Sequence, residues 1–181
     1  LECRLPGLSA WSRVRDYRQL QLQRMSNVNV YFDSTLGANE VLEYGFEHVA
    51  VATGSTWRRD GVARHHTFPI DISSDAEVLT PDDLMAGQRP AAERIVLYDD
   101  DHYYMGGVLA ELLSAEGYEV TLVTPAADVS HWTHATMEQH RIQTRLIECG
   151  VDIVTQRSVD AVTPDNVDTR CVFTGQSNTI E

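Results

Sequence analysis

The stretch that decides the fold reads I-V-L-Y-D-D-D-H-Y-Y-M-G-G and runs from Ile95 to Gly107. Its first four residues are apolar and include β-branched and aromatic side chains, which is typical of a strand. The acidic run ends that strand. A helix is then predicted from Gly107 to Glu116, where Gly117 stops it. A strand that leads through a short loop into a helix is the beginning of a βαβ unit.

The same alternation continues toward the C-terminus. A second strand is predicted at 120–123 and a third at 151–154, with a helix at 136–149 between them. The inward face of that helix is expected to carry Met137, Ile142 and either Leu146 or Ile147. Strands and helices at this spacing predict an α/β fold with a Rossmann-like, doubly wound parallel sheet. The tail at 159–173 is expected to form an antiparallel pair with a turn at 164–166.

The first half of the chain is less regular. One helix is predicted from Ser9 to Met25 and another at 38–44. The segments 28–32 and 48–52 have the β-branched and aromatic composition of strands.

A clear helix start follows a loop-like stretch that runs from Ser55 to Ser74. Thr80 is a capping residue, a proline comes next, and two aspartates lie in the first turn, where the helix dipole stabilises carboxylates. The helix is expected to stop at Gly87. We place a domain boundary near residue 90, so that 1–90 and 91–181 form two parts.

A dinucleotide-binding unit would carry a GxGxxG loop after its first strand, because glycine lets the backbone approach the pyrophosphate. Here Asp99, Asp100 and Asp101 take that place, and only Gly106 or Gly107 can match the last glycine, which serves helix–strand packing. Two like charges about 4 Å apart repel by about 4 kcal/mol at an effective dielectric constant of about 20, or about three decades of affinity. The second strand also ends without an acid for a ribose. We therefore predict a degenerate phosphate loop that does not bind NAD(P).

The aspartates have two other interpretations. A receiver-type acid pair would hold Mg²⁺ but needs a lysine, and a DxDx[TV] phosphotransferase motif does not fit because its fifth position is Tyr103. A solvated or helix-capping cluster explains them better. His131, His134 and His140, with Glu138, do not have the HExxH spacing. We expect no metal site in this chain.

The composition excludes several classes of function. The 181 residues carry a formal net charge of −13, and all 14 basic residues are arginine. Without lysine there is no Schiff-base lysine and no P-loop lysine. The acidic balance argues against a nucleic acid or an anionic membrane as partner, and no apolar run is long enough to span a bilayer.

The cysteines and the first residues suggest the setting of the chain. Cys3, Cys149 and Cys171 are far apart in sequence and form no CxxC pair, so neither a zinc ribbon nor a dithiol redox site is predicted. Such thiols are typical of a reducing compartment, and we expect a cytoplasmic protein. The chain begins without an initiator methionine or a signal peptide pattern. We expect a fragment of a larger protein.

A further motif lies where the strand predicted at 48–52 runs into Ala52-Thr53-Gly54. Other segments accompany it: Cys3-Arg4-Leu5-Pro6-Gly7, Trp11 with Arg15-Asp16-Tyr17, Leu79-Thr80-Pro81-Asp82, the run from Tyr98 to Met105, and Glu119-Val120-Thr121-Leu122-Val123. Over nearly the whole chain these segments resemble the trimethylamine dehydrogenase family. That family includes the histamine and dimethylamine dehydrogenases and N-methylproline demethylase-type proteins, with 2,4-dienoyl-CoA reductase more distant.

The resemblance implies a protein with an N-terminal (β/α)₈ barrel that binds FMN, a 4Fe-4S cluster, and C-terminal nucleotide-binding domains. FMN and the cluster would lie outside this chain, which would be inactive alone. Residues 1–90 would be part of an FAD/ADP-binding-type domain, and 91–181 the NAD-like Rossmann domain. Thr53, Gly54 and Ser55 would lie near a bound ADP or FAD.

The resemblance also implies a route for electrons. They would pass from an amine to FMN, to the cluster and then to an electron-transferring flavoprotein, near whose docking surface Trp11 and Arg13 could lie, so NAD(P)H would not be needed. Two alternatives remain open. One is a fragment of an NAD(P)H-dependent flavin oxidoreductase or dienoyl-CoA reductase, and the other is a non-catalytic interaction module. A homodimer is also left open.

Overall fold

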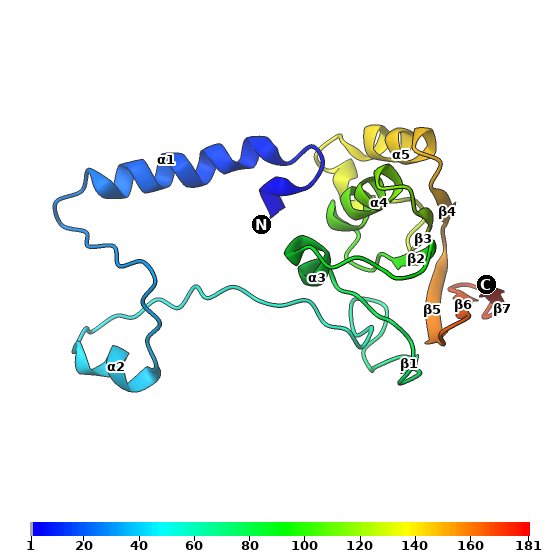
Figure 1. Cartoon of the computed structure of the whole chain (residues 1–181), viewed down its shortest axis with the longest axis horizontal. Coiled ribbons are helices and arrows are strands. Elements are labelled where there is room, and N and C mark those ends of the chain that lie inside the picture. The colour runs from blue at the N-terminus through cyan, green and yellow to red at the C-terminus, as the bar shows by residue number, and fades with distance from the viewer. Residues whose placement is uncertain (1) are drawn as a thin grey trace. The chain divides into compact units, whose positions relative to one another are not determined.

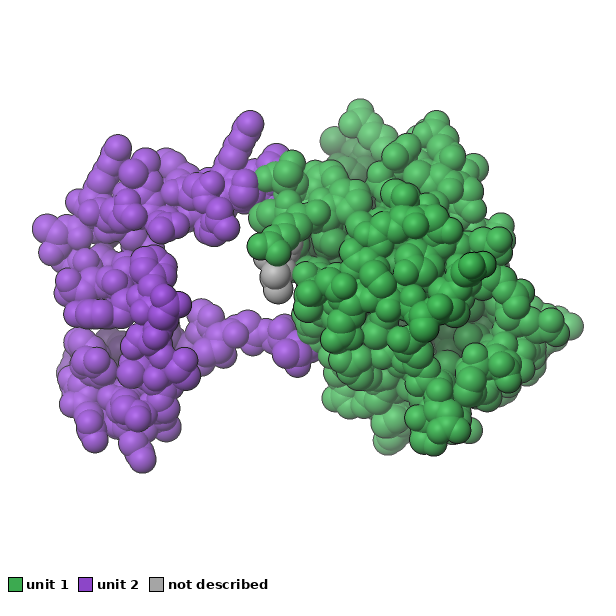
Figure 2. Space-filling view, viewed as in Figure 1, with its two compact units in different colours: residues 1–9, 57–181 green, residues 10–56 purple. Residues whose placement is uncertain are grey.

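The computed structural model describes residues 2–181, which divide into two units (Figures 1 and 2). The larger unit, green in Figure 2, comprises the residues up to Ser9 together with Trp57–Glu181. The smaller unit, purple in Figure 2, comprises Ala10–Thr56. The domain boundary predicted near residue 90 lies inside the larger unit and stays a prediction.

The smaller unit is built from two helices, α1 (Ser12–Gln23) and α2 (Ala38–Glu43), joined by extended chain. The two helices predicted there are confirmed. The strands predicted at 28–32 and 48–52 are wrong, because neither segment pairs with a neighbour among the described residues. A strand is held by hydrogen bonds to another strand, and composition alone supplies none.

A three-stranded parallel sheet lies at the centre of the larger unit. Its strands are β2 (Arg94–Tyr98), β3 (Glu119–Val123) and β4 (Asp152–Val154), in the order β2-β3-β4. Helix α4 (Met105–Ala115) connects β2 to β3, and α5 (Gln139–Glu148) connects β3 to β4. The predicted α/β class, the parallel strands and the connecting helices are confirmed.

The core forms where α4 packs against β2, β3 and α5. Figure 1 shows α4 and α5 next to each other. Leu113, Leu122 and Leu146 are almost completely buried, and full burial of a leucine contributes about 1.5–3 kcal/mol. Met137 was predicted to face inward, but its side chain is 87% exposed. The reason is that Met137 has a φ of 60° and precedes α5, so it does not share the helix periodicity. Of the alternatives Leu146 and Ile147, the inward residue is Leu146.

A second sheet of four strands has the order β1-β5-β6-β7. The short strand β1 (Asp71–Ile72) pairs in parallel with β5 (Arg157–Val162), and β5 pairs antiparallel with β6 (Val167–Cys171). The predicted antiparallel tail is confirmed. Its last strand, β7 (Ser177–Ile180), was missed.

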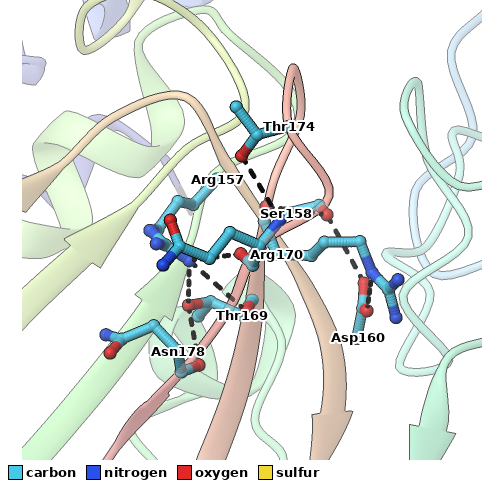
Figure 3. A network of polar contacts seen from close by, with 8 residues as sticks. Arg157, Ser158, Asp160, Thr169, Arg170, Thr174 and Asn178 are labelled. Atoms are coloured by element: carbon cyan, nitrogen blue, oxygen red, sulfur yellow. Dashed lines mark hydrogen bonds and ion pairs between the residues drawn. The ribbon is translucent and has the colours of Figure 1, made fainter.

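Polar side chains tie this sheet together (Figure 3). The Nη1 of Arg157 donates to the carbonyl oxygens of Thr169 and Gln176, at 3.4 and 3.2 Å. The hydroxyl of Thr169 donates to the carbonyl oxygen of Asn178 at 3.0 Å. These bonds join β5, β6 and β7, so the position of the polar strand β7 depends on its partners.

The short helix α3 (Pro81–Ala86) begins and ends as predicted. The Oδ2 of Asp83 accepts hydrogen bonds from the backbone N and the hydroxyl of Thr80, at 2.7 and 2.8 Å. Arg59 also pairs with Asp83 at 2.6 Å. The Arg59 guanidinium and these Thr80 bonds lower the pKa of Asp83 to about 2. Gly87 ends the helix with a φ of 100°.

Three short 3₁₀ helices complete the described elements: η1 (Glu2–Arg4), η2 (Ser9–Trp11) and η3 (His131–His134). Within residues 2–181, none of the helices has the length and apolar character that crossing a bilayer requires.

Candidate functional site: the acidic end of the first parallel strand

Two buried aspartates, Asp99 and Asp100, directly follow the strand β2 and are only 3% and 4% exposed. The Oδ1 of Asp99 accepts hydrogen bonds from the backbone N of Asp101 and of His102, both at 3.2 Å. His102 has a φ of 63°, in the left-handed region. The Asp99 side chain therefore closes a tight turn between β2 and α4 and fixes the course of the loop.

Asp99 also lies against the first turn of α4. A Cβ atom on Gly106 would be 2.5 Å from the Cγ of Asp99 and 2.8 Å from its Oδ2. In a dinucleotide-binding unit the phosphates occupy the helix N-terminus. Here the carboxyl group of the chain itself approaches that end of the helix, and the degenerate phosphate loop stays a prediction.

The second glycine of the pair has a different neighbour. A Cβ atom on Gly107 would be 2.9 Å from the Cγ2 of Ile142 and 3.1 Å from the Oγ of Ser130. Gly106 therefore permits helix–strand packing, the role predicted for one of the two, and Gly107 permits close packing of α4 on α5.

Burial raises the pKa of Asp99 to about 6, although the hydrogen bonds from the loop amides and the nearby His102 lower it. Its Oδ2 has no hydrogen-bond partner among the described residues. Asp99 is thus a carboxyl group that changes its charge near neutral pH in a place closed to solvent.

Asp100 is held by residues of the same chain. Its Oδ2 accepts a hydrogen bond from the backbone N of His65 at 2.8 Å, and its Oδ1 lies 3.0 Å from the Nε2 of His102. Burial disfavours the Asp100 carboxylate, but the bonds from His102 and His65 outweigh burial and lower its pKa. Asp100 is therefore a satisfied internal acceptor.

Asp101 is neutralised in a similar way. The Nε of Arg64 donates to the carbonyl oxygen of Asp101 at 3.0 Å, and its Nη2 lies 3.8 Å from the Oδ1 of Asp101. The same guanidinium lies 3.9 Å from the centre of the Trp132 ring, which is a cation–π contact. The segment that contains Arg64 and His65 thus lies against the acidic strand end.

A shallow pocket of about 270 Å³ opens at this point. It is lined by Arg64, His65, Asp100, His102, Pro125, Ala126, His131 and Trp132. Asp100 and Pro125 follow the carboxyl ends of β2 and β3, the edge at which parallel α/β sheets bind ligands. The pocket contains one fixed cation and three imidazoles beside one carboxylate.

The predicted nucleotide-proximal residues Thr53, Gly54 and Ser55 lie in the smaller unit, and all three are exposed. Gly54 has a φ of 78°, and nothing lies within 4 Å of the place of its Cβ atom. The backbone there is open to an approaching group. The acidic strand end belongs to the larger unit.

A third group of side chains surrounds the turn before η3. The Nδ1 of His131 and the Nε2 of His134 each lie 2.6 Å from one oxygen of Asp128. The sequence drew attention to both histidines, but we missed Asp128. A carboxylate three residues before the first histidine was the available signal.

Comparison with known proteins identifies the family of this fold. The model of the OYE-like second alpha/beta domain matches residues 79–179. The chain belongs to the OYE-like second alpha/beta domain family. The matched residues include α3, both connecting helices, all three parallel strands and the antiparallel tail. The acidic strand end is thus part of the family domain.

Several relatives have names that describe amine oxidation. The OYE-like chain is 30% identical over 171 residues to dimethylamine dehydrogenase from Hyphomicrobium sp. (strain x), covering 91% of this chain and 23% of that protein. Histamine dehydrogenase from Rhizobium sp. 4-9 is 54% identical with a TM-score of 0.94, covering 99% of this chain and 28% of that one.

The 6-hydroxypseudooxynicotine amine oxidase from Pseudomonas geniculata N1 is 41% identical with a TM-score of 0.90, covering 99% of this chain and 27% of that one. The predicted resemblance to the trimethylamine and histamine dehydrogenases is confirmed, and these relatives are oxidoreductases. The chain spans about a quarter of the length of the relatives that it matches.

Proposed function

We propose that this chain is the nucleotide-binding-like portion of a longer amine dehydrogenase that uses FMN and a 4Fe-4S cluster. The observation that carries the proposal is the acidic strand end. The carboxylates of Asp100 and Asp101 pair with His65, His102 and Arg64 of the same chain, so a pyrophosphate would meet carboxylates that already have partners. An enzyme that takes electrons from an amine has no need of NAD(P)H, and the similarity to amine-oxidising relatives agrees with this.

Residues 91–181 then form a Rossmann-like domain, and residues 1–90 part of an FAD/ADP-binding-type domain. The exposure of side chains in the first half supports its assignment as only part of a domain. No residue between 10 and 56 is buried, although this segment includes large apolar side chains. Tyr31, Val51 and Phe46 are 78%, 79% and 70% exposed. Apolar surface of this kind is ordinarily covered in a folded protein, and we propose that other parts of the longer protein cover it.

The residues of this chain do not fit an iron–sulfur cluster. In residues 2–181, the group of metal-ligand side chains that comes together is Asp128, His131 and His134, without a cysteine. Iron–sulfur clusters are held by cysteine thiolates. We therefore propose that the cluster and FMN are bound elsewhere in the longer protein, and that this chain has no catalytic centre of its own.

The open backbone at Thr53, Gly54 and Ser55 fits an ADP or FAD group better. The positive φ of Gly54 and the empty space beside it let a nucleotide approach the main chain closely, and the neighbouring hydroxyls are hydrogen-bond donors. A bound ADP would fix this segment, while a bound FAD would also supply a second flavin.

The intact protein that contains this chain provides the test. We expect it to reduce an electron-transferring flavoprotein in the cytoplasm with an N-methylated or biogenic amine as the donor. Stopped-flow spectra should show flavin bleaching with dimethylamine, trimethylamine or histamine and none with NADH. Rapid bleaching by NADH, together with no response to any amine, would refute the proposal.

The nucleotide content of the intact protein separately tests the proposal that residues 1–90 bind ADP or FAD. The intact protein is denatured, and the released ADP or FAD is measured by chromatography. Thr53→Ala and Gly54→Val should each lower the content, whereas Thr67→Ala, a change at an exposed threonine of the larger unit, should not. Equal nucleotide content in all variants would show that this segment does not contact the nucleotide.

A further inference from the structure

The turn that precedes α5 gathers one carboxylate and two imidazoles on its outer side. Asp128, His131 and His134 each offer one ligand atom, and these atoms all lie within 4.8 Å of one another. Each histidine nitrogen is 2.6 Å from a different oxygen of the Asp128 carboxylate. The two rings meet edge to face, with their centroids 5.3 Å apart.

The local backbone holds this arrangement in place. Ser130 is fully buried in the left-handed region, with a φ of 51°, and starts the 3₁₀ helix η3. Residues three apart in a 3₁₀ helix lie above one another, so His131 and His134 share one side. Between them, buried Thr133 donates both its backbone N and its hydroxyl to the carbonyl oxygen of Ser130, at 2.8 and 2.7 Å.

A second anchor comes from the acidic strand end. The backbone N of Trp132 donates to the carbonyl oxygen of His102 at 2.9 Å. The turn is thus fixed at Ser130, Trp132 and Thr133, while the side chains of His131 and His134 are about half exposed, at 49% and 55%. The ligand atoms are ordered by buried residues and can be reached from solvent.

We propose that Asp128, His131 and His134 bind a divalent transition-metal ion of the zinc class. Two imidazoles and one carboxylate are a donor set that suits Zn²⁺, whose bonds to these atoms are about 2.0–2.2 Å long. Neighbouring ligand atoms of a tetrahedral site are then about 3.3 Å apart. The observed 2.6 Å contacts need to open by less than about 1 Å, which rotation of the exposed rings provides.

Metal binding also requires no net release of protons. In neutral histidines the Nδ1 of His131 and the Nε2 of His134 donate to Asp128, and the lone pairs lie on the other ring nitrogens. The metal takes the nitrogens that face Asp128, and each proton moves to the outer nitrogen of the same ring. No net proton is lost from the neutral form. Three protein ligands leave one tetrahedral position for a water molecule or an anion.

His131 connects this site to the pocket, because it also lines it. A bound ion adds positive charge at the rim on which Arg64 and His65 already lie. The site also ties the turn that carries Trp132, and through it the cation–π contact with Arg64. A metal here stabilises the segment that covers the acidic strand end.

Calorimetric titration with ZnCl₂ tests the proposal on the full chain, purified without a histidine tag and stripped with a chelator. We expect saturable binding of one Zn²⁺ per chain. His131→Ala and His134→Ala should each weaken it by at least about tenfold, and Asp128→Asn should weaken it as well. The matched control is His140→Ala, because His140 is an exposed histidine on α5 outside the group.

Two results would overturn the assignment. One is the absence of binding at one ion per chain, and the other is equal affinity of wild type, H131A and H134A. Co²⁺ gives a second readout, because its visible absorption should report nitrogen and oxygen ligands. A strong thiolate charge-transfer band would instead place the ion on a cysteine and refute the site. Circular dichroism checks that each variant is folded. We expect this because the exposed histidines are not part of the core.

Discussion

The Cγ of Asp99 lies 2.5 Å from the point that a Cβ atom on Gly106 would occupy. Asp99 directly follows the last residue of β2, and Gly106 lies in the first turn of α4. The contact leaves no room for a single methyl group at position 106. The identity of each residue therefore limits that of the other, and this gives a direct test of the strand end.

Gly106→Ala should lower the free energy of unfolding by about 1–3 kcal/mol, the usual cost of overpacking. Without a clash, alanine would stabilise the helix by about 1 kcal/mol relative to glycine. A lower free energy of unfolding in the alanine variant therefore identifies the clash. Urea denaturation measures it. In the double variant with Asp99→Gly the space is restored, and the combined loss should be smaller than the sum of the single losses. Additive losses would show that the two residues do not touch.

The pKa of Asp99 predicts a pH dependence of stability. Its value in the folded protein is about 6, above the ordinary 3.8, because burial disfavours the carboxylate. The folded state binds this proton more tightly than the unfolded chain. The contribution of Asp99 is therefore fully present below about pH 4 and is lost as the pH rises through about 6.

Asp99→Asn cannot ionise, so it should be more stable than wild type at pH 7.5, by up to about 3 kcal/mol. That advantage should shrink as the pH falls from 7 to 4, as measured by urea denaturation at each pH. Asp75→Asn, a change at an exposed aspartate, should give no such trend. Parallel pH curves for wild type and D99N would contradict a raised pKa at Asp99.

NADH should not bind at the carboxyl end of β2. Asp100 is already bonded to His65 and His102, and Asp101 to Arg64, so a pyrophosphate would meet carboxylates and displace their partners. A ligand that binds only the folded state raises its melting temperature. We expect no rise with about 1 mM NADH in a thermal shift assay, under conditions where several degrees would mark binding.

Cys171 should react with alkylating agents near neutral pH. The hydroxyl of Thr174, aided by the backbone at Thr174 and Phe173, lowers the pKa of its thiol to about 7. The rate of carboxamidomethylation at Cys171, followed by peptide mass spectrometry, should rise with a midpoint near pH 7. Thr174→Val should move that midpoint to higher pH. An unchanged midpoint would show that the hydroxyl does not stabilise the thiolate.

Much of the larger unit could be predicted because its signals are local. Short apolar runs mark β2, β3 and β4, Gly117 and Gly150 come shortly before the last two, and the capping residue Thr80 marks α3. The segment 28–32 has the same composition as a strand and forms none. Pairing depends on chain that is distant in sequence, and no periodicity reports whether that chain is present.

For strand β7 the prediction failed in the opposite direction, because a strand forms where the sequence predicted none. Ser177, Asn178 and Thr179 have little of the apolar character of a strand, but they pair with β6 residue by residue. The hydroxyl of Thr169 and the guanidinium of Arg157 supply the bonds that hold this edge (Figure 3). A strand stabilised by its neighbour's polar groups leaves almost no pattern in its own sequence.

For the candidate site, the position of the acidic loop was predictable and its partners were not. His65 reaches Asp100 from 35 positions earlier in the chain, and Arg64 reaches Asp101 from 37 positions earlier. Asp128 was missed for a related reason. Its spacing to His131 acquires a meaning only when Ser130 adopts the left-handed conformation that starts η3.

The pairing of the acidic loop with the Arg64–His65 segment has a consequence for protein engineering. Replacing the aspartates with glycines would not recreate a dinucleotide site, because the His65 amide and the His102 ring would lose their acceptor. Arg64 would keep its place on Trp132 and the loop carbonyl. A designer would have to redesign two distant segments together. Changing Asp100 alone would remove that acceptor, so we expect stepwise routes to a dinucleotide site to pass through less stable variants.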